Sequence, residues 1–243
     1  MSTHDFGDGR GPVPAHRHRN PDGTGGGWVA ETAWVSGNAE VSGNAWVSGN
    51  AWVSGDARVY GNARVSGIAE VSGDARVYGN ARVYGNAKVS GNAEVSGNAR
   101  VSGNAEVSGD ARVYGNARVY GAAEVSGDAW VCGNAEVSGD ARVYGNAEVY
   151  GNARVYGNAD IISVGPVGSE GRYVTAWRTA DGGHRIVAGC WSGTAAELRD
   201  RVAGSPGGWS GAEGADRDRW RAEYEAVCSL VEVTVGPPRE AAS

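Results

Sequence analysis

A six-residue repeat, Ala-x-Val-[Ser/Tyr]-Gly-[Asn/Asp], runs from Ala33 to Asn158 and occurs twenty-one times without an insertion. A short fixed period is typical of stacked units that cannot bury an apolar face alone. Because Ala and Val are two residues apart, both point to the same side of an extended segment, and x points to the other. Gly and Asn or Asp tolerate the bends of a corner. Each repeat is therefore predicted to be a short strand and a corner, with Val and Ala inside.

The sixth repeat position indicates how many repeats make one coil. With three repeats per coil, residues eighteen apart stack, and one column is Asn seven times: Asn44, Asn62, Asn80, Asn98, Asn116, Asn134 and Asn152. A second column holds four of the five Asp, and the third holds both departures, Ile68 and Ala122. Such columns predict a three-sided parallel β-helix of about seven coils with Asn ladders along the stack. Duplication of an eighteen-residue unit would leave the same trace, since residues 69–86 and 105–122 differ at one position.

The first 26 residues and the general composition set the expected organisation. Residues 1–26 are rich in Gly, Pro, Asp and Arg and predict a disordered N-terminal arm. Residues 27–32 keep the phase but lose the corner residues, so they predict a capping coil at the start of a β-helix over 27–161. The three cysteines are too few for a disulfide framework, and no apolar run reaches the ~20 residues of a membrane span. Without a secretory signal pattern, we expect a cytoplasmic protein.

The repeat phase fails after Asn158, and residues 162–236 predict a small α+β capping or docking domain. Two alternating segments, 173–178 and 184–191, flank Asp181-Gly-Gly183 and predict a hairpin after a glycine linker at 165–171. Thr194-Ala-Ala-Glu197 is a capping box that opens a first helix. Trp220, Tyr224 and Val227 predict a second helix, and the valines at 231, 233 and 235 predict a last strand. Residues 237–243 are expected to form a disordered tail.

The x side chains face solvent and supply the candidate interaction surface. Four Trp crowd the first coils on two adjacent sides, and four Arg follow one another up one side. The residues of this surface are Trp28, Trp34, Trp46, Trp52, Arg64, Arg82, Arg100 and Arg118. Exposed Trp in such numbers marks a contact surface, and stacked like charges cost energy unless an anion lies against them.

Each feature of that surface has a structural and a functional interpretation. The Trp cluster is covered by the N-terminal arm or a neighbouring subunit, or it is a platform for carbohydrate. The Arg row is solvated β-surface, or it binds a polyanion such as nucleic acid by charge and stacking. The net charge of −6 argues against a dedicated nucleic-acid binder. Paired corner Asp could bind calcium between coils, but such Asp normally bond their own backbone.

Catalytic chemistry finds little support in the sequence. His184 and Cys190 lie on one predicted strand face, but six residues along a strand separate them by roughly 20 Å. We therefore expect a hydrogen-bonded or exposed His184 and a buried Cys190, not a nucleophile and its base. No catalytic residue, cofactor site or metal site is assigned.

The hexads, for example Ala57-Arg-Val-Tyr-Gly-Asn62, resemble the hexapeptide-repeat family of left-handed parallel β-helices and look closest to its YdcK-like branch. Residues 162–235 resemble a module joined to such repeats in bacterial and phage-encoded proteins. The resemblance implies left-handed coiling. It also implies trimers and acyltransferase activity, with an acceptor hydroxyl deprotonated by a His on the coils. Here no His occurs between His18 and His184 and no loop interrupts the hexads, so no catalytic residue is carried over.

The sequence therefore favours a non-enzymatic β-solenoid scaffold or interaction protein. We expect a homo-oligomer, with a trimer favoured by the resemblance, and a protein partner that the sequence does not identify. An acyltransferase-like enzyme is the first alternative. A polyanion-binding rod that uses the four Arg is the second.

Overall fold

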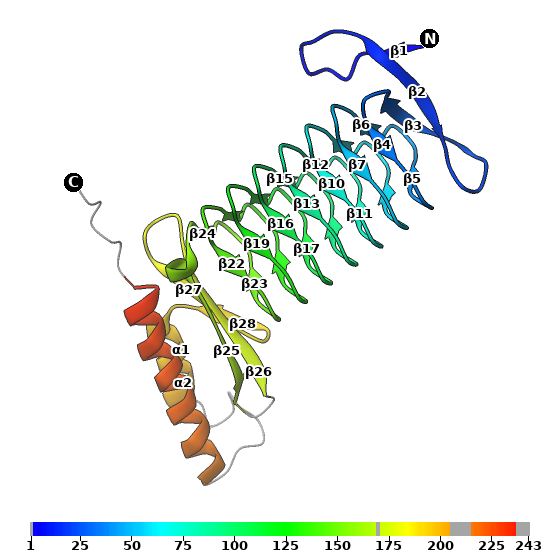
Figure 1. The fold of residues 1–243 in the computed structure, drawn as a ribbon. Coiled ribbons are helices and arrows are strands. Elements are labelled where there is room, and N and C mark those ends of the chain that lie inside the picture. The colour runs from blue at the N-terminus through cyan, green and yellow to red at the C-terminus, as the bar shows by residue number, and fades with distance from the viewer. Residues whose placement is uncertain (1, 169–170, 205–214, 237–243) are drawn as a thin grey trace.

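The computed structural model describes residues 2–168, 171–204 and 215–236. Stacked coils form a long rod, with an N-terminal hairpin at one end and an α+β module at the other (Figure 1). The predicted disordered tail, 237–243, lies outside the described residues.

The rod has three sides, each a sheet in which the repeat strands run parallel and strands eighteen residues apart are neighbours, as the column pattern predicts. On side 1 the N-terminal segment extends the sheet with antiparallel strands. Each strand within the repeat is the two-residue segment x-Val, because the corner residues interrupt it on both sides. Side 1 contains β1 (Thr3–His4), β2 (Val13–Arg19), β3 (Gly25–Ala30), β6 (Trp46–Val47), β9 (Arg64–Val65), β12 (Arg82–Val83), β15 (Arg100–Val101), β18 (Arg118–Val119), β21 (Glu136–Val137) and β24 (Arg154–Val155). Side 2 contains β4 (Trp34–Val35), β7 (Trp52–Val53), β10 (Glu70–Val71), β13 (Lys88–Val89), β16 (Glu106–Val107), β19 (Glu124–Val125) and β22 (Arg142–Val143). Side 3 contains β5 (Glu40–Val41), β8 (Arg58–Val59), β11 (Arg76–Val77), β14 (Glu94–Val95), β17 (Arg112–Val113), β20 (Trp130–Val131) and β23 (Glu148–Val149).

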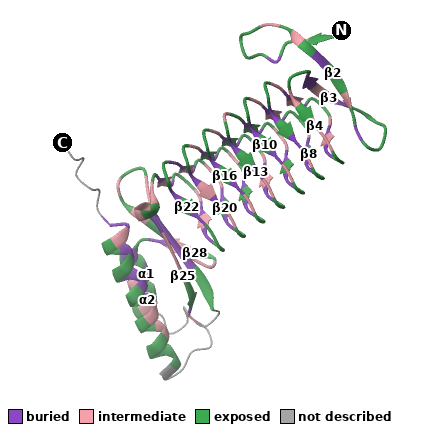
Figure 2. Ribbon diagram, viewed as in Figure 1, coloured by how far each residue is buried: buried purple, intermediate pink, exposed green. Residues whose placement is uncertain are grey.

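The rod is held together by a narrow apolar core and by backbone hydrogen bonds between coils. From Ala39 to Val155 the repeat Ala and Val side chains are at most 2% exposed. In Figure 2 short buried segments, in purple, therefore alternate along the rod with exposed segments in green. Three N–H groups per hexad donate to the next coil: Arg82 to Ala99 (2.9 Å), Tyr84 to Val101 (3.0 Å) and Asn86 to Gly103 (2.8 Å). Because each coil covers the apolar side chains of the coils beside it, the stability of one coil depends on its neighbours.

The corners confirm the Asn ladder. In the all-Asn column every side-chain amide donates to the carbonyl oxygen of the Asn one coil on, from Asn44 through Asn152, at 3.1 to 3.3 Å. In the Asp-rich column, Asn38 donates to Asp56 and Asn92 donates to Asp110, both at 2.9 Å. Asp56 and Asp110 therefore extend the same stacking pattern, since each accepts a bond from the Asn of the coil before it.

The N-terminal segment differs from the disordered arm that its composition predicts. β2 pairs antiparallel with β3, and β3 pairs parallel with β6 in the register Trp28↔Trp46. The open edge of side 1 supplies backbone hydrogen-bond partners that composition does not reveal. On side 3, His18 Nε2 lies 3.3 Å from the Ala39 carbonyl oxygen and the Asn20 carbonyl oxygen accepts a bond from the Val41 N–H. The segment therefore covers the first coil on two sides.

The C-terminal module begins directly after the rod. A 3₁₀ turn, η1 (Asn158–Asp160), leads into an antiparallel sheet of β25 (Ile161–Val167), β26 (Arg172–Arg178), β27 (His184–Ala188) and β28 (Trp191–Gly193), followed by α1 (Ala195–Gly204) and α2 (Ala215–Thr234). The hairpin and the capping box are confirmed: the Glu197 carboxylate accepts the Thr194 N–H at 2.8 Å. None of these helices, in the residues described, is long and apolar enough to cross a membrane.

Two local predictions for this module are wrong. The glycine linker contributes Gly165-Pro-Val167 to β25, because the antiparallel partner β26 pairs with it as far as Val167. The predicted last strand is instead the end of α2. Val231 is fully buried and Val233 is 86% exposed, and this pattern fits a helical period and not an alternating one.

The module closes the end of the rod. Trp177, Ile161 and Val187 join the same core cluster as the repeat valines, and the Trp177 ring lies 5.0 Å from the Tyr150 ring. A separate small core between the sheet and the two helices includes Ile186, Leu198 and Val231. The terminal Val and Ala of the rod are thereby shielded from solvent.

Candidate interaction surface

The eight candidate residues lie on two adjacent sides of the rod, the four Trp in its first coils and the four Arg in the coils that follow on side 1. Trp28 and Trp46 begin side 1 and stand above the four Arg in strict register, while Trp34 and Trp52 begin side 2. All eight lie on the outer face, as the alternation within each repeat predicts.

Trp28 and Trp46 are covered by the N-terminal segment. The His4 ring stacks on Trp28 with a centroid distance of 4.5 Å, and Phe6 meets Trp46 edge-on at 5.9 Å. Arg17 lies over the Trp28 ring, 4.8 Å from its centroid. This packing buries His4 enough to lower its pKa, because the charged imidazolium would lose solvation. The prediction that the arm covers the Trp cluster is therefore confirmed for this pair.

Trp34 and Trp52 are not covered. Their side chains are 58% and 50% exposed, and their ring centroids lie 5.9 Å apart with the planes tilted by 42°. They stand beside the one side of the first coil that the N-terminal segment leaves open, since β4 is the terminal strand of its sheet among the described residues. Ala33 and Val35 are consequently only partly buried. On side 2, two exposed Trp side chains therefore lie next to a strand edge that has no pairing partner in the part of the chain that the structure describes.

The four Arg of side 1 have different surroundings. Arg64 lies over the Trp46 ring at 4.2 Å, and Arg118 pairs with Glu136 at 3.5 Å. Arg82 and Arg100 lie between them and face only other Arg in the neighbouring coils. The centre of the row therefore keeps two cations without a carboxylate.

A groove runs from the N-terminal loop to this row. It has a volume of about 410 Å³, within the range of small-molecule sites. Residues from the loop and from four successive coils line it: Phe6, Asp8, Arg10, Trp46, Ser48, Arg64, Ser66, Arg82, Tyr84 and Arg100. Sequence reasoning missed the loop residues, because nothing in the low-complexity segment 5–12 indicates that it folds back over side 1.

His184 and Cys190 do not form a catalytic pair. His184 Nε2 accepts a hydrogen bond from the Ala195 N–H at 3.1 Å and so holds the start of α1. The satisfied His184 was predicted, but the buried Cys190 was not found: its side chain is exposed, because Cys190 lies in the turn between β27 and β28. Within the described ranges, no group of three or more His, Cys, Asp or Glu is placed to hold a metal ion.

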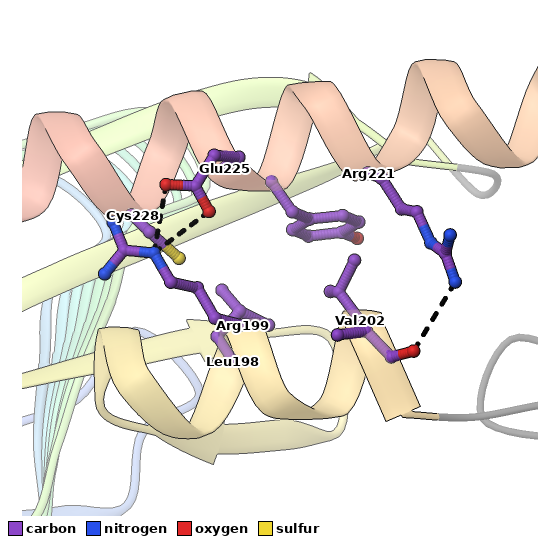
Figure 3. A pocket seen from close by; sticks show the side chains of 8 residues that line it. Leu198, Arg199, Val202, Arg221, Glu225 and Cys228 are labelled. Atoms are coloured by element: carbon purple, nitrogen blue, oxygen red, sulfur yellow. Dashed lines mark hydrogen bonds and ion pairs between the residues drawn. The ribbon is translucent and has the colours of Figure 1, made fainter.

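A second cavity, of about 300 Å³, lies between α1 and α2 (Figure 3). Its one thiol, Cys228, lies 3.5 Å from the Ala195 carbonyl oxygen, and burial raises its pKa to about 11. The thiol is therefore protonated at neutral pH and is a poor nucleophile. Arg199 is held by the carboxylates of Glu225 and Glu232, as the dashed lines to Glu225 show in Figure 3. These contacts tie the two helices together.

Fold and surface together define a parallel β-solenoid repeat protein with a capped rod and an outward-facing aromatic and cationic surface. A family model described as YdcK Beta solenoid repeat matches seven segments of the rod: residues 39–55, 57–73, 69–85, 75–91, 93–109, 111–127 and 147–159. The repeat region is therefore a β-solenoid of the YdcK repeat type. No curated protein and no solved structure matches the chain.

Proposed function

We propose that this protein is a non-enzymatic β-solenoid scaffold that self-associates through the exposed Trp34 and Trp52 on side 2. The observation that carries the proposal is the adjacent pair of exposed Trp side chains beside a strand edge that the N-terminal segment does not cover. Rings of this size are enriched at protein interfaces because they bury large area at low entropic cost. The occupant is a further copy of this chain. The proposal retains left-handed coils, a trimer and a cytoplasmic location as expectations.

Light scattering coupled to size-exclusion chromatography tests the association. The chain has a mass of 25.0 kDa, so a trimer has three times that mass. The double variant Trp34→Ser, Trp52→Ser is expected to elute as a monomer, because the buried aromatic area is lost. Trp130→Ser is the matched control: Trp130 has the same repeat position and is 39% exposed, but it lies on side 3. A monomeric wild type, or an oligomer that survives the double substitution, would contradict the proposal.

The rival function is an acyltransferase-like enzyme. His184, a residue that such an enzyme could present to a neighbouring chain, is engaged at the start of α1 through its Nε2 acceptor. A calorimetric titration with acetyl coenzyme A separates the two functions. We expect no saturable heat; saturable binding would overturn the scaffold proposal in favour of the enzyme.

A further inference from the structure

Charges on the outer face are paired between coils on two of the three sides. Neighbouring x side chains lie about 4.8 Å apart along the rod, so an acidic residue in one coil is within reach of a basic residue in the next. The pairs are Arg58–Glu40 (3.8 Å) and Arg76–Glu94 (3.3 Å) on side 3, and Lys88–Glu106 (3.8 Å) and Arg142–Glu124 (3.5 Å) on side 2. Arg112 on side 3 lies over the Trp130 ring instead. Each of these cations is therefore compensated.

Arg82 and Arg100 break this rule. Among the described residues neither has an ion pair or a ring contact, and their in-register neighbours are Arg64 and Arg118. Those neighbours are already engaged, Arg64 by Trp46 and Arg118 by Glu136. Stacked like charges destabilise a sheet. An anion against the two free guanidinium groups would remove that cost.

The same two Arg line the groove beneath the N-terminal loop. Arg10 reaches the groove from the loop, where its charge is offset by Asp8 at 3.9 Å. The hydroxyl groups of Ser66 and Tyr84 line the same wall and are hydrogen-bond donors. The groove thus combines two uncompensated cations, one coil apart, with neutral hydrogen-bond donors on the same wall.

We propose that this groove binds a ligand carrying two or more linked phosphate groups, with Arg82 and Arg100 each contacting the phosphate chain. Guanidinium forks match phosphate oxygens bidentately, and two forks one coil apart suit a chain of phosphates along the rod. The cationic run is short, because Glu136 follows Arg118 on side 1. A short oligophosphate therefore fits better than a long polyanion. The inference goes beyond the proposed scaffold function, because it concerns the groove on side 1 and not the Trp34 and Trp52 surface of side 2.

Isothermal titration calorimetry at low ionic strength tests the site, with sodium tripolyphosphate as the probe. We expect saturable binding with one site per chain. The double variant Arg82→Ser, Arg100→Ser should weaken it by about tenfold or more, since hydrogen bonds to charged groups are strong. Arg58→Ser, Arg76→Ser is the matched control: it removes the same charge from the same repeat position in two consecutive coils of side 3. The control variant should bind within about twofold of the wild type.

A further variant and further ligands identify the ligand class and show that lost binding is not caused by misfolding of the rod. Arg10→Ser changes the opposite wall without touching the rod, and it should also weaken binding. ATP binding more tightly than tripolyphosphate would support a nucleotide, and equal binding would support an inorganic chain. Absence of saturable binding, equal weakening by both double variants, or equally tight binding of citrate would overturn the oligophosphate site. None of these results depends on the oligomer mass, so failure here is distinct from failure of the scaffold proposal.

Discussion

Corner glycines show how a single residue type satisfies two requirements at once. Gly97 and Gly151 both have positive φ, +64° and +68°, which disfavours any residue with a Cβ. At Gly97 a Cβ would also lie 3.0 Å from the backbone N and O of Gly115 in the next coil. At Gly151 no atom lies within 4 Å of that Cβ position. The first requirement is visible in the sequence as a turn residue; the second arises only when coils stack.

Alanine at these two corners should therefore have unequal cost. Gly97→Ala and Gly151→Ala should each lose about 1–2 kcal/mol of stability from the strained φ. Gly97→Ala should lose about 1–3 kcal/mol more, because the stacked corner must move away. Urea unfolding followed by circular dichroism measures the difference. Equal losses in the two variants would mean that coil stacking does not constrain the corner.

At the scale of strands and helices, the sequence predicts the structure correctly where a short local pattern is compatible with only one conformation. The hairpin around Asp181 and the box at Thr194 are examples, since their turn and cap chemistry is local. Val231, Val233 and Val235 fit a strand and a helix equally well until packing selects Val231 for the core. The fold of the N-terminal segment and the groove that its loop forms over Arg82 depend on contacts with distant coils. Periodicity alone predicts the row of Arg but cannot reveal these contacts.

The junction between β27 and α1 carries a pH-sensitive contact. His184 Nε2 accepts the Ala195 N–H, and burial lowers the pKa of His184 from its ordinary value of 6.5 although the charge of Glu232 opposes this shift. An unfolded His184 therefore takes up a proton at a higher pH than the folded one. Stability contributed by this group is present above pH 6.5 and falls as the pH drops below that value.

Replacing His184 by Gln should reduce this pH dependence. The Gln carbonyl oxygen can accept the Ala195 N–H but does not titrate. We expect the thermal midpoint of the wild type to fall more steeply than that of His184→Gln between pH 7 and about 5. His4 and His18 also have lowered pKa values and contribute to the pH dependence of both proteins. The quantity to compare is therefore the difference between the thermal midpoints of the two proteins at each pH. Glu225 and Glu232, whose pKa values Arg199 lowers below 4.5, titrate outside this range. Parallel profiles would contradict the assignment.

Over the whole molecule, the number of hexads sets which side each residue occupies. The N-terminal loop is fixed over side 1 by the β2–β3 pairing. Arg82 and Arg100 lie on the same side because three hexads separate Arg64 from Arg82 and three more separate Arg82 from Arg100. Removing one hexad would keep the Val and Ala core but turn everything after it by one side. Whether the groove forms therefore depends on the number of repeats as well as on the residues that line it.

Two deletions of identical sequence test this dependence. Residues 69–74 and 123–128 both read Ala-Glu-Val-Ser-Gly-Asp. Deleting 69–74 should leave a folded rod but carry Arg82 and Arg100 away from the N-terminal loop, so tripolyphosphate binding should be lost although every Arg is retained. Deleting 123–128 removes the same residues beyond Arg118, keeps Arg64, Arg82, Arg100 and Arg118 in register, and should leave binding unchanged. Circular dichroism verifies the fold of both proteins and calorimetry measures the binding. Composition and charge are identical in the two deletion proteins. Loss of binding in only the first would therefore show that the site requires Arg82 and Arg100 to be aligned beneath the loop. Equal binding by both proteins would refute this dependence.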